Sequence, residues 1–190
     1  MKRIIFVLTF MMFGILSYAQ DISSQDSLQR QAEFISKTAK KFNKSTNEFD
    51  GNTWYTPKTG LFGMTHYLYF QHKDGIYTNL RLHSTCITHD WVFVNKMTFK
   101  INGKFYSIDV SKTDRRVSST KYGTYCHETI DESVSFNKEL CDAIYNAIGD
   151  VIVRFEGTDG YHDQKMSEKE LQLMKETVLF FKALGGKIYD

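Results

Sequence analysis

The chain has 190 residues, with 24 Lys and Arg against 22 Asp and Glu. Lys2 and Arg3 precede an apolar run, and without the first 19 residues the two signs balance at 22 each. A balanced charge gives no electrostatic reason to expect a nucleic acid or an anionic membrane as partner. Residues 20–190 contain a single proline, Pro57, and no Ser/Gly-rich tract, so they fit one domain without an internal linker.

The first 19 residues have the three parts of a secretory signal peptide. Lys2 and Arg3 form a basic segment, residues 4–16 are mostly apolar, and Ser17 and Ala19 are small residues at a cleavage position. A membrane anchor is the alternative, but the apolar run is short of the roughly 20 residues that span a bilayer. We therefore expect cleavage after Ala19 and a periplasmic or secreted protein, with no membrane insertion of the mature chain.

A helix is predicted over residues 24–43. Its apolar residues recur at spacings of three and four, which puts one stripe on a period of 3.6 residues. The stripe consists of Leu28, Ala32, Ile35, Ala39 and Phe42.

From Phe49 to about Phe136 the pattern changes to the alternation of strands and hairpins. The clearest hairpin spans residues 96–110, because Asn102-Gly103 is a preferred pair for a two-residue turn in which both residues have positive φ. With this turn Phe99 faces Tyr106 and Met97 faces Ile108. Turn chemistry and apolar pattern therefore predict the same register.

A second hairpin is predicted at Asp74-Gly75, joining residues 65–72 to residues 76–88. The first of these strands carries Tyr67 and Tyr69, and in the second Leu80 and Leu82 alternate with polar residues. Further strands are expected at residues 54–55, 91–94 and 115–130.

The C-terminal part alternates helix, strand and helix. Residues 135–148 predict a helix and residues 151–155 a buried strand, and Ser167 with Glu170 forms a capping box that opens a last helix ending at Gly185-Gly186. The fold class is therefore α+β: an antiparallel sheet of about six strands built from hairpins, with an N-terminal helix and two C-terminal helices packed on it.

No metal or cofactor is expected. The most metal-like string is His83-x2-Cys86-x2-His89, but on a strand Cys86 would point away from the face that both histidines share. The polar segment 157–163 is interpreted as a loop, and its acids lack the spacing of a calcium-binding loop.

The three cysteines raise a disulfide question, since exported proteins mature where thiols oxidise. Cys141 lies on the apolar stripe of the predicted helix, which leaves Cys86 and Cys126 as the candidate pair. Cys126 is followed by His127, but neighbouring strand residues point to opposite faces, which disfavours a Cys–His nucleophile within this pair.

Six residues are candidates for a binding site. Arg154 lies in the middle of a strand and forms either a structural ion pair or an anion site. The other candidates are a histidine–acid group and two tyrosines: His127, Glu128, His162, Tyr67 and Tyr69.

Two functions are consistent with these residues. The first is a non-enzymatic domain that binds a protein or a cell-surface molecule through aromatic residues. The rival is a small exported hydrolase, which would need a pocket that joins His127 or His162 to a carboxylate and Arg154. An aromatic patch without such a pocket would favour binding.

The leader generates the first prediction. N-terminal sequencing of the exported protein is expected to start at Gln20, either free or cyclised, because Ala19 ends the signal-peptide pattern. Recovery of protein that begins with Met1 from a membrane fraction would contradict cleavage.

Overall fold

The computed structural model describes residues 27–58, 63–112, 115–119 and 124–190; the predicted leader lies outside them. The chain divides into two units, residues 1–40 and residues 41–190. In the first unit, residues 27–39 form a helix. Within the described ranges, no helix combines the length and the apolar character needed to cross a membrane.

The second unit begins with a run of strands, and among the described residues helices appear only in its C-terminal part. All strand pairs that the structure describes are antiparallel, so the predicted α+β class is confirmed. Its elements are β1 (Phe42–Thr46), β2 (Thr53–Pro57), β3 (His66–Lys73), β4 (Ile76–Thr88), β5 (Val94–Ile101), β6 (Lys104–Asp109), β7 (Arg115–Ser119), β8 (Cys126–Ser133), α2 (Lys138–Tyr145), β9 (Ile152–Gly157), β10 (Gly160–Lys165) and α3 (Glu168–Ala183).

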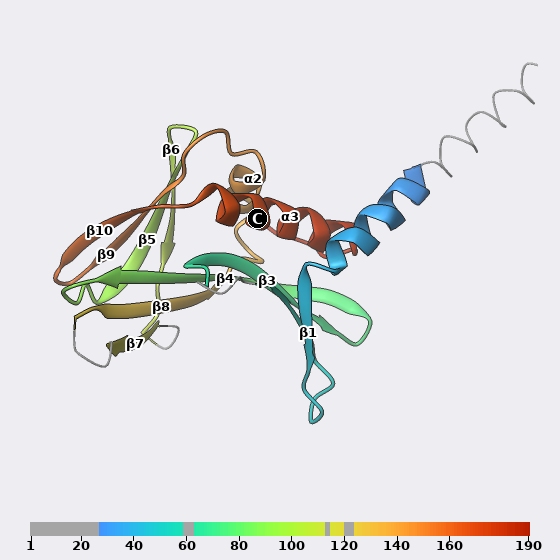
Figure 1. Ribbon diagram of the computed structural model, residues 1–190, viewed down its shortest axis with the longest axis horizontal. Helices are drawn as coiled ribbons and strands as arrows, with labels where there is room; N and C mark the ends of the chain where they lie inside the picture. Colours follow the sequence, from blue (N-terminus) through green and yellow to red (C-terminus); the bar gives the residue numbers. More distant parts are fainter. Residues whose placement is uncertain (1–26, 59–62, 113–114, 120–123) are drawn as a thin grey trace, which may run out of the picture. The chain divides into compact units, whose positions relative to one another are not determined.

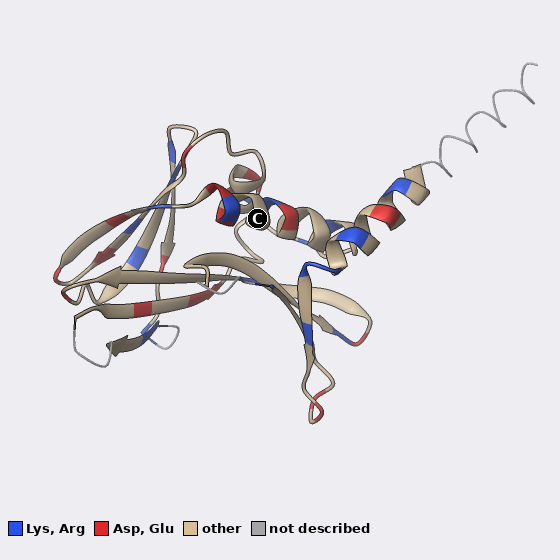
Figure 2. Cartoon of the chain, viewed as in Figure 1, with Lys and Arg blue, Asp and Glu red and all other residues tan. Residues whose placement is uncertain are grey.

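The strands form two antiparallel sheets where the sequence predicted one. A six-stranded sheet has the order β1-β2-β3-β4-β8-β7, and a four-stranded sheet has the order β10-β9-β5-β6. Helix α3 lies against β3 on one side of the six-stranded sheet, and α2 packs against α3 (Figure 1). Acidic and basic residues are interspersed along both sheets and α3 (Figure 2).

Both predicted hairpin turns are confirmed. Asn102 and Gly103 have φ values of 50° and 78°, and Phe99 pairs with Tyr106, as the turn chemistry required. Asp74 and Gly75, with φ values of 51° and 80°, join β3 to β4.

The predicted N-terminal helix is too long at its C-terminal end. The structure ends it at residue 39 and begins β1 at Phe42. Phe42 is buried, and its ring centroid lies 5.0 Å from that of Phe180 on α3. Packing between residues distant in sequence therefore overrides the helical spacing at this position.

The predicted polar loop 157–163 is also corrected, because residues 160–165 form β10, a strand at the edge of the four-stranded sheet. Its polar composition suits an edge strand. Gly157 ends β9 and lies against the main chain of the segment that joins β4 to β5. A Cβ at this position would lie 2.0 Å from the carbonyl oxygen of Val92. The backbone approach thus requires glycine at this position.

The core lies between α3 and the inner surfaces of the two sheets. The ring of Phe70 on β3 lies 5.0 Å from that of Tyr55 on β2 and 5.3 Å from that of Phe181 on α3. At the other end of β3, His66 stacks on Phe155 of the four-stranded sheet at 5.9 Å. Strand β3 therefore contributes to both halves of the core.

Glu170 connects the start of α3 to the start of β3. One carboxylate oxygen accepts from the backbone N–H groups of Thr65 (2.7 Å) and His66 (3.0 Å), and the other from the hydroxyl of Ser167 (2.6 Å). Burial alone would raise the pKa of Glu170, but these hydrogen bonds outweigh it and lower the pKa to about 2. The predicted capping box is confirmed and has an additional tertiary role.

The turn at Asn102-Gly103 generates the second prediction. Gly103→Val should lower the free energy of unfolding by about 1–2 kcal/mol, because a β-branched residue resists positive φ. No atom lies within 4 Å of the added Cβ, so the loss reports backbone strain alone. Urea melts measure it, with Lys104→Val on the adjacent exposed strand position as control. Equal melts for both variants would contradict the turn type.

Candidate binding face of the six-stranded sheet

The six-stranded sheet has a fully covered inner face and a partly exposed outer face. Along β2, β3, β4 and β8 buried residues alternate with half-buried or exposed ones. The cross-strand register places most residues of the second kind on one side, whereas Thr88 and Glu132 pair with buried Cys126 and Leu82 on the inner side. We call the first side the outer face; on these strands it comprises Trp54, Thr56, Tyr67, Tyr69, Gln71, Lys73, Ile76, Thr78, Arg81, His83, Thr85, Ile87, His127, Thr129, Asp131 and Ser133.

Four rings form a row across three strands of the outer face. The ring of Trp54 on β2 lies 5.4 Å from that of Tyr69 on β3. Tyr69 lies 6.1 Å from Tyr67, and Tyr67 stacks on His83 of β4 at 4.4 Å. Such contacts between aromatic residues on neighbouring strands stabilise a sheet and fix the orientation of each ring.

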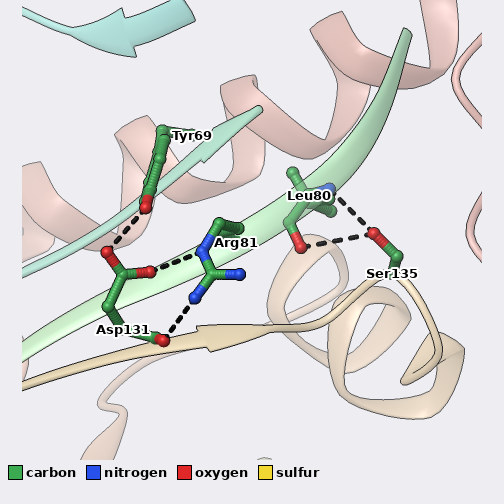
Figure 3. A network of polar contacts seen from close by, with 5 residues as sticks. All are labelled: Tyr69, Leu80, Arg81, Asp131 and Ser135. Carbon is green, nitrogen blue, oxygen red and sulfur yellow. Dashed lines mark hydrogen bonds and ion pairs between the residues drawn. The ribbon is translucent and has the colours of Figure 1, made fainter. Parts of the chain in front are cut away.

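Asp131 holds the centre of the row (Figure 3). The hydroxyl of Tyr69 donates to Oδ2 of Asp131 at 2.6 Å, and Nε of Arg81 donates to Oδ1 at 2.7 Å. Nη2 of Arg81 also donates to the main-chain oxygen of Asp131 at 2.5 Å. Burial and the bond to Asp131 raise the pKa of Tyr69, so this phenol stays protonated. Because both oxygens of Asp131 accept hydrogen bonds, the carboxylate orients its neighbours and is poorly placed to act as a base.

Hydroxyl groups continue the outer face beyond His83. The hydroxyl of Thr85 lies 3.4 Å from Nε2 of His83 and 3.4 Å from the hydroxyl of Thr129. Burial lowers the pKa of His83, so its imidazole is neutral near pH 7. With the Arg81–Asp131 pair compensated internally, the central part of the face carries no net charge.

Three of the six predicted site residues lie on the outer face. Tyr67 and Tyr69 contact each other, and His127 lies further along β8. The prediction missed Trp54, Arg81, His83 and Asp131. The alternation of residues 80–83 does place Arg81 and His83 on one face, whereas only the register between β4 and β8 brings Asp131 beside Arg81.

Glu128, another predicted site residue, does not reach the surface. Its side chain is completely buried on the inner face. Oε1 accepts from the backbone N–H groups of Val92 (2.7 Å) and Phe93 (2.8 Å), and Oε2 accepts from that of Val94 (2.8 Å). Phe93 has a φ of 54°, and successive N–H groups around such a residue form an anion-binding concavity. Here the chain's own carboxylate fills it, so the role of Glu128 is structural.

Arg154 and His162 do not form the pocket that a hydrolase would need. Nε and Nη2 of Arg154 donate to the two carboxylate oxygens of Asp163 on β10, at 2.7 and 2.8 Å. The guanidinium also lies 4.4 Å from the ring centroid of Tyr161. His162 points to the opposite face of β10, because it lies between Tyr161 and Asp163 on the strand. Of the two roles considered for Arg154, the structure shows an ion pair, formed with Asp163.

The cysteines are three free, buried thiols. Cys86 pairs with Glu128 and Cys126 with Thr88, so the two candidates lie diagonally on the inner face. Diagonal neighbours in an antiparallel sheet are about 7–8 Å apart, further than a disulfide spans. Burial raises the pKa of Cys86 and of Cys141 to about 12, which keeps both thiols unreactive.

Metal ligands do not cluster within the part of the chain that the structure describes, where no three of His, Cys, Asp or Glu come together. His83 lies on the outer face and Cys86 is buried on the inner face. The two residues therefore lie on opposite faces, as strand alternation predicted.

Comparisons with known proteins add no family to this geometry: no family model matches the chain, and neither the curated proteins nor the solved structures give a significant match.

Glu128 generates the third prediction. Glu128→Gln should lower the free energy of unfolding by about 2–4 kcal/mol, because a neutral amide accepts weaker hydrogen bonds and places an N–H₂ group against backbone donors. Chemical denaturation measures the loss. Glu139→Gln, in the exposed first turn of α2, is the matched control and should change stability by less than about 1 kcal/mol. A Glu128→Gln variant as stable as this control would contradict the structural role.

His66 generates the fourth prediction, on pH. It is completely buried, its Nδ1 lies 3.1 Å from the hydroxyl of Ser84, and its Nε2 has no hydrogen-bond partner among the described residues. Burial lowers its pKa from 6.5 to about 4, although the charge of Glu170 opposes this shift. Since the unfolded chain binds the proton more readily, stability is full above pH 6.5 and falls as the pH decreases toward 4.

Protonation of His66 is expected to lower the free energy of unfolding by about 2 kcal/mol between pH 7 and pH 4.5. Denaturation of the wild type and of His66→Gln at both pH values measures it as the difference between their pH dependences. His89→Gln, at an exposed position, should keep the pH dependence of the wild type. Identical pH dependence in the wild type and His66→Gln would contradict the prediction.

Proposed function

We propose that the protein is an exported, non-enzymatic binding domain whose binding site is the outer face of the six-stranded sheet. The observation that carries the proposal is the row formed by Trp54, Tyr69, Tyr67 and His83, held by Asp131. Rigid Trp and Tyr side chains lose little conformational entropy on binding and offer both apolar surface and hydrogen-bonding groups. Export rests on the signal-peptide pattern of residues 1–19.

The arrangement gives the rival hydrolase hypothesis little support. A shallow cavity of about 440 Å³ on the four-stranded sheet is lined in part by Arg154, Asp163 and Glu156, but no histidine belongs to its described lining. On the outer face, Asp131 is occupied by Tyr69 and Arg81. Among the described residues, neither place joins a histidine to Arg154 and a carboxylate, which is the combination that the hydrolase hypothesis requires.

The proposal is tested with the labelled mature protein and the envelope fraction of the cells that produce it. Trp54→Ala should weaken binding at least about ten-fold, because truncating an aromatic anchor removes most of its contact surface. Phe105→Ala is the matched control, since Phe105 is an exposed ring on the four-stranded sheet (68 % exposed). Binding that Trp54→Ala leaves unchanged, or an absence of binding by the wild type, would overturn the proposal.

A further inference from the structure

The outer face has a composition that discriminates between classes of ligand. Its aliphatic members, Ile76 and Ile87, lie at the two ends of β4. Between these ends, the members are aromatic rings, hydroxyl groups, imidazoles, the amide of Gln71 and the Arg81–Asp131 pair. The centre of a stable protein interface is mostly apolar, and lipid surfaces bind exposed aliphatic residues beside lysines. Ile76 pairs with Lys73 at the hairpin end of the face, but the centre of the outer face, around Tyr67 and His83, offers neither combination.

The electrostatics at the centre of the outer face argue against a charged ligand, and the exposed Arg116 of β7 lies at its edge, opposite Thr129. The guanidinium of Arg81 makes two hydrogen bonds to Asp131, one to its side chain and one to its main chain. A ligand phosphate or carboxylate would have to compete with this pair for the cation. Burial keeps His83 neutral near pH 7. The centre of the face therefore suits a ligand without charge that presents many hydroxyl groups.

We propose that the outer face binds an uncharged polysaccharide, with Trp54, Tyr69 and Tyr67 as the rings on which sugar units stack. The inference rests on the proposed function and names its ligand class. A pyranose ring has an apolar face of C–H groups and a rim of hydroxyl groups. Aromatic rings bind the first, and the hydroxyl groups of Thr56, Thr85 and Thr129 suit the second as donors or acceptors. The row crosses three strands, so it extends over more than one sugar unit.

The direct test is native affinity electrophoresis of the mature protein in gels that contain xyloglucan, galactomannan, amylopectin or laminarin, together with sedimentation on chitin and cellulose. At least one of these uncharged polysaccharides should retain the wild type. Trp54→Ala and Tyr67→Leu should each weaken the retention at least about ten-fold, and Phe105→Ala should leave it unchanged. Thermal melts show that each variant is folded; if Trp54→Ala unfolds, Trp54→Phe with Tyr67→Leu replaces it.

Retention by none of the six polysaccharides, or equal retention of the wild type and both aromatic variants, would overturn the polysaccharide assignment. Two treatments of the envelope fraction separate this failure from failure of the proposed function. Protease should leave binding that depends on Trp54 intact. Periodate, which cleaves vicinal diols, should abolish it if the retaining polysaccharide is xyloglucan, galactomannan, amylopectin or cellulose, but not if it is laminarin or chitin, whose internal units lack such diols. Loss of this binding after protease treatment would assign a protein ligand to the same face: the proposed function would stand and the polysaccharide inference would fall.

Discussion

The buried carboxylate of Glu128 holds the segment that carries the chain from one sheet to the other. After β4 the chain leaves the six-stranded sheet, and at Val94 it enters the four-stranded sheet. Between them Phe93 adopts positive φ, which costs about 1–2 kcal/mol for a residue with a side chain. Three hydrogen bonds to an ionised carboxylate offset that strain and the desolvation of the charge.

Glu170 plays a comparable part where α3 meets β3. It ties the first turn of α3 to the beginning of β3, where His66 also stacks on Phe155. Both acids lie on the inner side of the six-stranded sheet and both are satisfied by backbone donors. The two carboxylates thus anchor the inner side of the sheet at two places, at the start of β3 and beside β8. A rigid sheet presents its aromatic row in one geometry, which favours binding without rearrangement.

The outer face combines groups that are often found in catalytic sites with an arrangement that suits binding. Histidine, aspartate, arginine and tyrosine lie together, yet both carboxylate oxygens of Asp131 accept hydrogen bonds that orient Tyr69 and Arg81. Arg154 is likewise held by an acid, because its guanidinium donates to both carboxylate oxygens of Asp163. Residue types alone favoured a binding domain and left a hydrolase as its rival; the partners of Asp131 and Arg154 add support to the proposed binding function.

Local rules determined the elements whose structure depends on few residues. Asn102-Gly103 and Asp74-Gly75 specified their turns because positive φ selects these residues, and Ser167 with Glu170 specified the start of α3. Strand alternation placed Tyr67 and Tyr69 on one face. Tertiary structure alone decided that Phe42 leaves the helix for the core, that Glu128 is buried in a backbone concavity, and that Asp131 meets Arg81. These outcomes depend on which strands become neighbours, and pairing between residues far apart in sequence leaves no local pattern from which to predict it.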